Sequence, residues 1–308
     1  MTSTDFPTDN RRGAAWMLGS IAGATGMTIA VKLLTPELHS AMLAFLRSAL
    51  GLLLILPILI GAWRKAHRPE RPGRPLQFTA WPLHLLRGVL ISLALNGGFY
   101  ALWHLPLATA TILFFLAPVF ATMLAVPVLG EAVGIRRWSA IAIAFLGALM
   151  ILRPGFGPGI SLASAMAVLS SMAFAMTLMV GKLAARADGP DAVFVSSSVV
   201  VVFTTLPLAL AFWDLPGSGA QWAGVALLVL GSGLRTYSDI QAYAVGEVGF
   251  LAPISYLRLV TVGIAGYLLF QETVDLTTVT GGAVIVGATL YIAWREALRG
   301  GSAGGGMP

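Results

Sequence analysis

Ten long apolar runs constrain this chain more than any other feature of its sequence. A membrane-spanning α-helix needs about 20 mainly apolar residues, and each run approaches or exceeds that length. The runs lie at 13–34, 39–62, 82–103, 106–129, 134–152, 160–182, 191–213, 221–243, 248–270 and 277–294. The chain has 308 residues, so the short connections between the runs leave no room for a soluble domain. The sequence therefore predicts an all-α integral membrane protein with ten transmembrane helices.

Composition agrees with this fold class and excludes several functions. The chain is 57% hydrophobic and 10% charged, whereas a soluble domain is about 25% charged. The net charge of +6 comes from basic residues in loops between the runs, which predicts contact with lipid headgroups and no nucleic-acid partner. The absence of cysteine excludes disulfides, thiolate metal sites and cysteine nucleophiles. No cofactor or metal is expected.

The uneven distribution of basic residues predicts the orientation in the membrane, because cytoplasmic loops are enriched in Lys and Arg. With the N-terminus inside, 13 of the 19 basic residues fall in inner segments, and only Lys32 and Arg153 fall in outer ones. The inner set is Arg11, Arg12, Arg64, Lys65, Arg68, Arg71, Arg74, Arg136, Arg137, Lys182, Arg186, Arg295 and Arg299. Arg11 and Arg12 precede an apolar run without a cleavage site, so we expect a retained first span. The prediction is a multi-pass protein of a bacterial-type inner membrane with both termini cytoplasmic, as a monomer or weak homo-oligomer.

An internal repeat appears when the chain is shifted by 141 residues. Residues 107–151 then lie over 248–292, and Glu131 matches Glu272. Each half contains five spans, so the second half must be inverted relative to the first, as in many secondary transporters. We predict a cytoplasmic segment at 1–12, repeats at 13–152 and 153–294, and a flexible cytoplasmic tail at 295–308.

The fourth-span motif ATILFFLAPVFATMLAVPVLGE, at 110–131, and the counterpart YLLFQE, at 267–272, are similar to the drug/metabolite transporter superfamily. The resemblance is to its ten-helix EamA-type branch and covers nearly the whole chain. It implies movement of small metabolites by alternating access, and the most similar subgroup is the amino-acid exporters, including aromatic ones. The second copy carries Arg258 and Leu259 where such proteins often have an acidic residue and a proline.

Three ionisable residues lie inside apolar runs near the C-terminal end of the chain. Arg235 and Asp239 are four residues apart and share a helix face, and Arg258 lies in the next run. Charges near a bilayer centre normally face protein or water, because insertion costs about 2.5–3.5 kcal/mol for each. Structural pairing of Arg235 with Asp239 and a role in a polar transport pathway both remain open. For Arg258 we favour binding of a substrate carboxylate.

A polar and aromatic stripe marks the third run. Ser92, Asn96 and Tyr100 are spaced four residues apart, and the 141-residue shift places Asn96 over Tyr237 and Tyr100 over Gln241. These residues are therefore predicted to line a shared central chamber. The alternative is that they bond neighbouring helices or belong to the interfacial aromatic belt.

Other residues extend the predicted pathway. Ser255 lies on the face of Arg258, with Tyr256 nearby, and Arg47 lies in the outer half of the second run. The predicted substrate-binding residues are Asn96, Tyr100, Tyr237, Asp239, Tyr256 and Arg258. The predicted pathway-lining residues are Arg47, Ser92, Arg235, Gln241 and Ser255. Arg87 is expected to reach the headgroups, and Glu131 and Glu272 are expected to be solvated at helix ends.

These features favour a secondary transporter that exports amino acids, or an importer or exchanger of another metabolite such as a nucleoside, vitamin or drug-like compound. Neither a Walker sequence nor an esterase or metalloprotease motif is present, so ATP drive and enzyme activity are not expected. A membrane scaffold would not need Asn96, Asp239 and Arg258 at bilayer depth. Pairing with Arg235 would keep Asp239 ionised, which favours facilitated or weakly proton-coupled movement.

Overall fold

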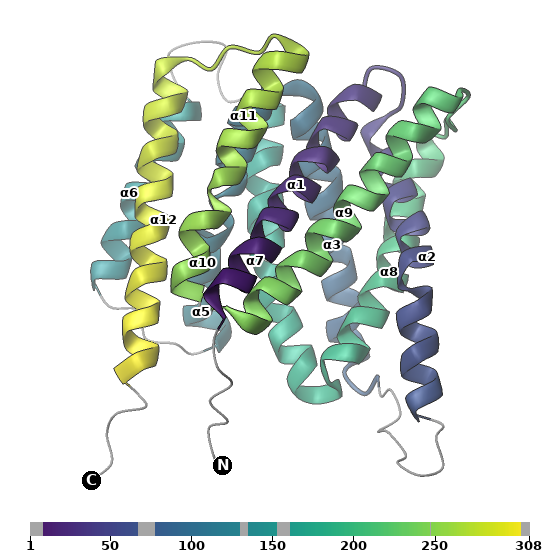
Figure 1. Ribbon diagram of the computed structural model, residues 1–308, viewed down its shortest axis with the longest axis horizontal. Helices are drawn as coiled ribbons and strands as arrows, with labels where there is room; N and C mark the ends of the chain where they lie inside the picture. Colours follow the sequence, from purple (N-terminus) through teal and green to yellow (C-terminus); the bar gives the residue numbers. More distant parts are fainter. Residues whose placement is uncertain (1–8, 67–77, 130–134, 153–160, 247, 303–308) are drawn as a thin grey trace.

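The computed structural model describes residues 9–66, 78–129, 135–152, 161–246 and 248–302. These residues form an upright helical bundle with no strand among them (Figure 1). The helices are α1 (Asn10–Leu34), α2 (Ser40–Ala66), α3 (Trp81–His104), α4 (Leu107–Phe114), α5 (Ala117–Leu129), α6 (Ile135–Leu152), α7 (Leu162–Asp188), α8 (Pro190–Ala211), α9 (Gly219–Val245), α10 (Val248–Ser255), α11 (Leu257–Phe270) and α12 (Leu276–Ser302). Six helical stretches are long and apolar enough to cross a membrane, and three shorter ones are also apolar. The predicted fold class is confirmed.

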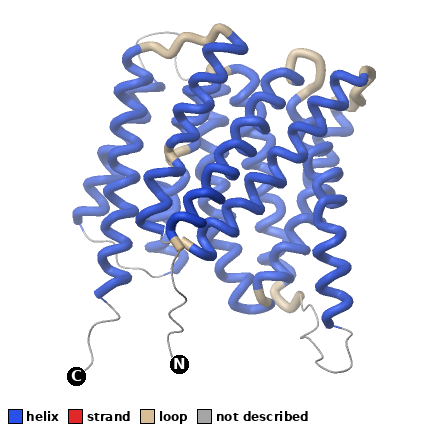
Figure 2. Tube along the Cα trace, in the orientation of Figure 1, coloured by secondary structure: helices blue, strands red, loops and turns tan. Residues whose placement is uncertain are grey.

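Two of the predicted spans are each divided into two helices. Phe115 and Leu116 separate α4 from α5, and Tyr256 separates α10 from α11 at mid-height of the bundle (Figure 2). Counting each divided pair as one unit gives the ten predicted units. Pro118 accounts for the first division, because it has no N–H to donate to the preceding turn and its ring crowds that turn. Tyr256 lies 141 residues after Phe115, which is the offset of the predicted repeat.

The packing of the helices follows the same offset. The most extensive contacts join α1 to α9 and α3 to α7, and α6 packs against α12. The 141-residue shift relates α3 to α9, and α1 and α7 are each the first helix of a predicted repeat, so the first contact is repeated by the second. An inverted repeat requires this pattern, which supports the division at 13–152 and 153–294; that division stays a prediction.

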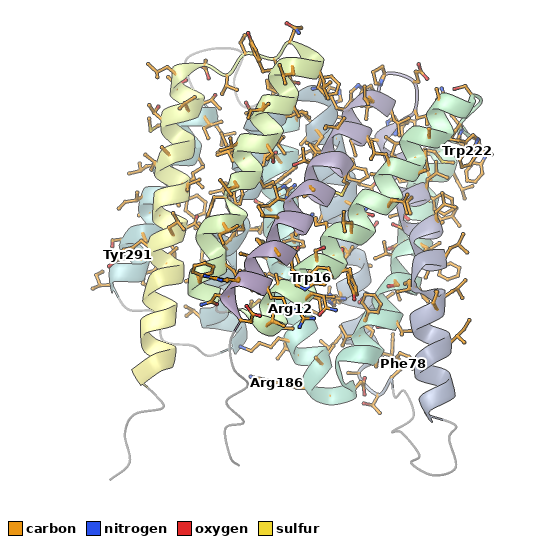
Figure 3. All side chains as sticks on the ribbon, viewed as in Figure 1. Arg12, Trp16, Phe78, Arg186, Trp222 and Tyr291 are labelled. Atoms are coloured by element: carbon orange, nitrogen blue, oxygen red, sulfur yellow. The ribbon has the colours of Figure 1, made fainter. Side chains whose placement is uncertain are left out.

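The first and last described helices mark one end of the bundle. The start of α1 and the end of α12 lie at the same end, and Arg12 and Arg186 lie toward it (Figures 1 and 3). Trp222, at the start of α9, lies at the opposite end. This agrees with a cytoplasmic side carrying both termini. Glu131 and the predicted basic loop at 68–74 lie outside the described residues.

Paired glycines bring α1 and α9 into backbone contact. A Cβ atom added to Gly23 would lie 2.6 Å from the carbonyl oxygen of Gly231, and one added to Gly231 would lie 2.8 Å from that of Gly23. Small residues allow this close approach of membrane helices. The contact fixes the register of α1 along α9 and thereby positions the polar residues on both helices.

A buried polar network joins α3, α7 and α8 near the end of the bundle that carries Arg186. His84 lies 2.9 Å from Asp188 through Nε2 and 2.7 Å from the Ser196 hydroxyl through Nδ1. Asp188 also accepts a hydrogen bond of 2.8 Å from the backbone N–H of Ala80 at the start of α3. Each of these side chains is buried, so the network serves to tie three helices together.

Arg87 extends the contact between α3 and α8. Its guanidinium donates a hydrogen bond to the Ser197 hydroxyl and lies against Gly181 of α7. We expected this side chain to reach the lipid headgroups, but a polar acceptor on the adjacent helix holds it inside the bundle.

Candidate functional site

The contact between α1 and α9 creates a polar cluster around Asp239. Ser20 of α1 donates a hydrogen bond of 2.5 Å to Asp239, and Nε of Arg235 lies 3.8 Å from the other carboxylate oxygen. Ser20 is one turn from Gly23, so the glycine contact places its hydroxyl opposite Asp239. The Arg235 and Asp239 side chains remain 30% and 35% exposed. The predicted pair therefore forms, with an additional donor that the sequence did not indicate.

Two further arginines lie around this cluster. The charge of Arg235 acts on Arg47 of α2 and on Arg258 at the start of α11, and Asp239 also acts on Arg258. The Nε atoms of Arg47 and Arg258 are buried without a hydrogen-bond partner in the described part of the chain. The structure thus brings together four ionisable residues that are distant in the sequence, and all four had been predicted to be functional.

The two helix breaks meet at an aromatic contact. The rings of Phe115 and Tyr256 stack with centroids 4.7 Å apart and an interplanar angle of 28°. The Tyr256 hydroxyl is hydrogen-bonded to Thr289 of α12. Tyr256 was predicted as a binding residue, whereas Phe115 was missed, although the 141-residue offset pairs these two positions.

Threonine hydroxyls link α1 to α11 close to Arg258. Thr25 and Thr261 lie 2.8 Å apart, and Thr261 also donates to the carbonyl oxygen of Arg258 at 3.1 Å. Ser255, predicted to line the pathway, is the last residue of α10 and directly precedes the break at Tyr256. Polar groups of α1, α9 and α11 are therefore continuous around the division of the α10–α11 unit.

The stripe on α3 has mainly local contacts. The amide nitrogen of Asn96 donates to the carbonyl oxygen of Ser92 at 2.9 Å, and its buried amide oxygen has no partner among the described residues. The ring of Tyr100 lies 4.2 Å from that of His104 and 6.4 Å from that of Trp103. These contacts agree with the predicted single face, and a role in substrate binding stays a prediction.

Tyr237 and Gln241 lie on a different face of α9 from Asp239. Gln241 donates a hydrogen bond of 2.9 Å to the Tyr237 hydroxyl, and the Tyr237 ring meets Trp16 edge-on at 5.6 Å. Tyr237 is 50% exposed. Residues two apart on a helix point in nearly opposite directions, so the face opposite Asp239 is the exposed one. Their predicted place in a shared chamber with Asn96 and Tyr100 stays a prediction.

An ion pair joins α1 to the segment after α11 at the end of the bundle opposite Arg186. Lys32 lies 2.9 Å from Glu272 and donates to the carbonyl oxygen of Leu105 at 2.8 Å. Glu272 also accepts a hydrogen bond of 2.7 Å from the N–H of Leu107, the first residue of α4. We predicted a solvated carboxylate at Glu272, but its side chain is only 13% exposed. Its partners come from distant helices, so no local pattern of residues indicated them.

The described residues contain no group of three or more His, Cys, Asp or Glu side chains that could hold a metal ion.

Comparisons with known proteins agree with this geometry. Residues 11–153 match the model of the EamA-like transporter family. Relatives include an S-adenosylmethionine uptake transporter of Rickettsia felis, 30% identical over 92% of this chain and 93% of that protein, and a riboflavin transporter of Vibrio cholerae, 30% identical over 92% and 94%. The pseudopaline exporter CntI of Pseudomonas aeruginosa is 28% identical over 86% and 90%. A solved crystal structure superimposes with a TM-score of 0.60 at 17% identity, covering 94% of this chain and 99% of that one.

The fold and the site together define a multi-pass membrane protein that moves small metabolites as a secondary transporter. The chain belongs to the EamA-like transporter family. This confirms the broader resemblance and places the chain among transporters rather than enzymes. The finer resemblance to amino-acid exporters is not supported, because these relatives are named for other substrates.

Proposed function

We propose that this protein imports a metabolite that combines a flat heteroaromatic ring with polar or charged groups, of the kind that S-adenosylmethionine and riboflavin represent. The observation that carries the proposal is the Asp239 cluster beside the stacked Phe115 and Tyr256. Ionised and aromatic groups there come from both predicted repeats. A substrate with both kinds of chemistry matches such a site better than a simple amino acid does.

The exposure of Arg235 and Asp239 supports a pathway that contains water. Each side chain is about one-third exposed although both lie within a membrane-spanning unit. Exposure of these charges to hydrocarbon would cost several kcal/mol, so the exposed portions face water between the helices. Water at this depth is what a substrate needs in order to enter and leave.

Counterflow in proteoliposomes tests the substrate class. Vesicles containing the purified protein are loaded with S-adenosylmethionine, riboflavin, phenylalanine or leucine, and uptake of the same labelled compound is followed. We expect counterflow with at least one of the first two compounds. Counterflow restricted to the amino acids would instead support the amino-acid transporter predicted from the sequence. A flat response to all four compounds would contradict the proposal.

The contacts of Asp239 bear on whether transport is driven by a proton gradient. Arg235 and the Ser20 hydroxyl both contact its carboxylate, and we propose facilitated movement without proton transfer at this residue. Transport by wild-type protein and by Asp239→Asn should show the same response to an imposed proton gradient. A gradient response that is present in the wild type and lost in Asp239→Asn would assign proton coupling to Asp239.

A further inference from the structure

Two arginines beside the proposed substrate site have unmet hydrogen-bonding capacity. A guanidinium group has five N–H donors and stays charged in proteins. The Nε atoms of Arg47 and Arg258 are buried and lack an acceptor in the described part of the chain. Buried donors normally have partners, because an unpaired one loses its bonds to water without replacement. Arg87 is the comparison: its Nε is also buried without an acceptor among the described residues, but its guanidinium donates to Ser197 through another nitrogen.

The charges of the cluster are also unbalanced. Arg47, Arg235 and Arg258 contribute three positive charges, and the charge of Arg235 acts on each of the other two. Asp239 contributes one negative charge. Among the acidic residues, only Asp239 lies inside a predicted span away from its ends. Asp239 already accepts a hydrogen bond from Ser20 and lies beside Arg235. The remaining positive charge has no counterpart on the described helices that carry the cluster.

We propose that Arg258 and Arg47 bind a carboxylate of the transported molecule. This inference rests on the proposed function and narrows it to zwitterions or organic anions that carry an aromatic ring. A carboxylate matches the fork of N–H donors of a guanidinium and supplies the missing negative charge. Tyr256, which stacks on Phe115, is two residues before Arg258 in the chain and offers an aromatic contact for the ring of the same molecule. A neutral vitamin without a carboxylate leaves both arginines unpaired.

A binding measurement tests the carboxylate site independently of transport. Purified protein in lipid nanodiscs is melted with phenylacetate, an aromatic carboxylate, with phenylacetamide, its neutral analogue, and with chloride at equal concentration. We expect phenylacetate alone to raise Tm. The shift should disappear in Arg258→Gln and Arg47→Gln, shrink in Arg258→Lys, which keeps the charge but loses the fork, and persist in Arg87→Gln. Equal shifts with phenylacetamide or chloride, or an unchanged phenylacetate shift in Arg258→Gln and Arg47→Gln, would overturn the inference.

Transport of two compounds that differ only in the carboxylate completes the test. Counterflow is compared for S-adenosylmethionine and its decarboxylated form, which keeps the ammonium, sulfonium and adenosine groups. Loss of the carboxylate should lower the rate at least tenfold, and Arg258→Gln should reduce the difference to less than twofold. Equal wild-type rates for both compounds would overturn the carboxylate role while leaving the proposed function in place. A carboxylate-specific Tm shift without counterflow of either compound would support the anion site and count against the proposed substrate.

Discussion

The ion pair between Lys32 and Glu272 allows a quantitative prediction from its geometry. At 2.9 Å, two unit charges attract by about 6 kcal/mol at an effective dielectric constant of about 20, before desolvation is subtracted. Their side chains are 17% and 13% exposed, so the pair is well shielded from bulk water. Lys32 also bonds the Leu105 carbonyl, and Glu272 bonds the Leu107 N–H. We expect a coupling energy of about 1–3 kcal/mol between the two side chains.

The assay is a double-mutant cycle with Lys32→Met, Glu272→Gln and the double variant. Lys32→Met leaves a largely buried carboxylate without its cation, so its unfolding free energy should fall by about 2–4 kcal/mol. Glu272→Gln keeps an acceptor for the Leu107 N–H and should cost less. The double variant should lose less than the sum of the two single variants. Stability is measured by denaturant unfolding in detergent micelles, and strictly additive effects would refute the ion-pair reasoning.

Three further outcomes follow from other contacts. Gly23→Ala should destabilise the protein by about 1–3 kcal/mol because the new methyl group meets the backbone of α9. Gly51→Ala is the control, because a Cβ atom there has no described atom within 4 Å, and it should be neutral or slightly stabilising. Thermal unfolding measures both variants. Tyr256→Ala should weaken substrate binding by about 0.5–1.5 kcal/mol through loss of the stack on Phe115, whereas Tyr256→Phe should keep both the stack and the affinity. Competition binding measures both variants, and equal losses of affinity would contradict this prediction. Partial burial and the nearby charge of His104 lower the pKa of His39. The stability that neutral His39 contributes is therefore complete above pH 6.5 and is lost as pH falls below that value. His39→Gln should flatten this part of the profile of Tm against pH.

The sequence was sufficient for the fold because each span carries its own signal. A run of about 20 apolar residues predicts a membrane helix without knowledge of its neighbours. The breaks at Phe115 and Tyr256 were less evident, because a broken helix is as apolar as a continuous one. Pro118 indicated a distortion at the first break. For the second break, the 141-residue offset from Phe115 points to Tyr256.

The site could be predicted only where its residues are close in sequence. Arg235 and Asp239 are four residues apart, so helical periodicity alone predicted their pairing. Ser20 reaches Asp239 across 219 residues, and that contact depends on the register set by Gly23 against Gly231.

Accessibility of the cluster to water tests the central claim most directly. The chain has no cysteine, so single-cysteine variants can be labelled without background. Thr261→Cys places a thiol beside Arg258, and Leu230→Cys places one at a position of α9 that is 59% exposed, as the lipid-facing control. A charged, membrane-impermeant methanethiosulfonate reagent should modify Thr261→Cys in intact proteoliposomes and leave Leu230→Cys unmodified. A Thr261→Cys thiol that reacts only after denaturation, from neither side of the membrane before it, would contradict a transport pathway through this cluster.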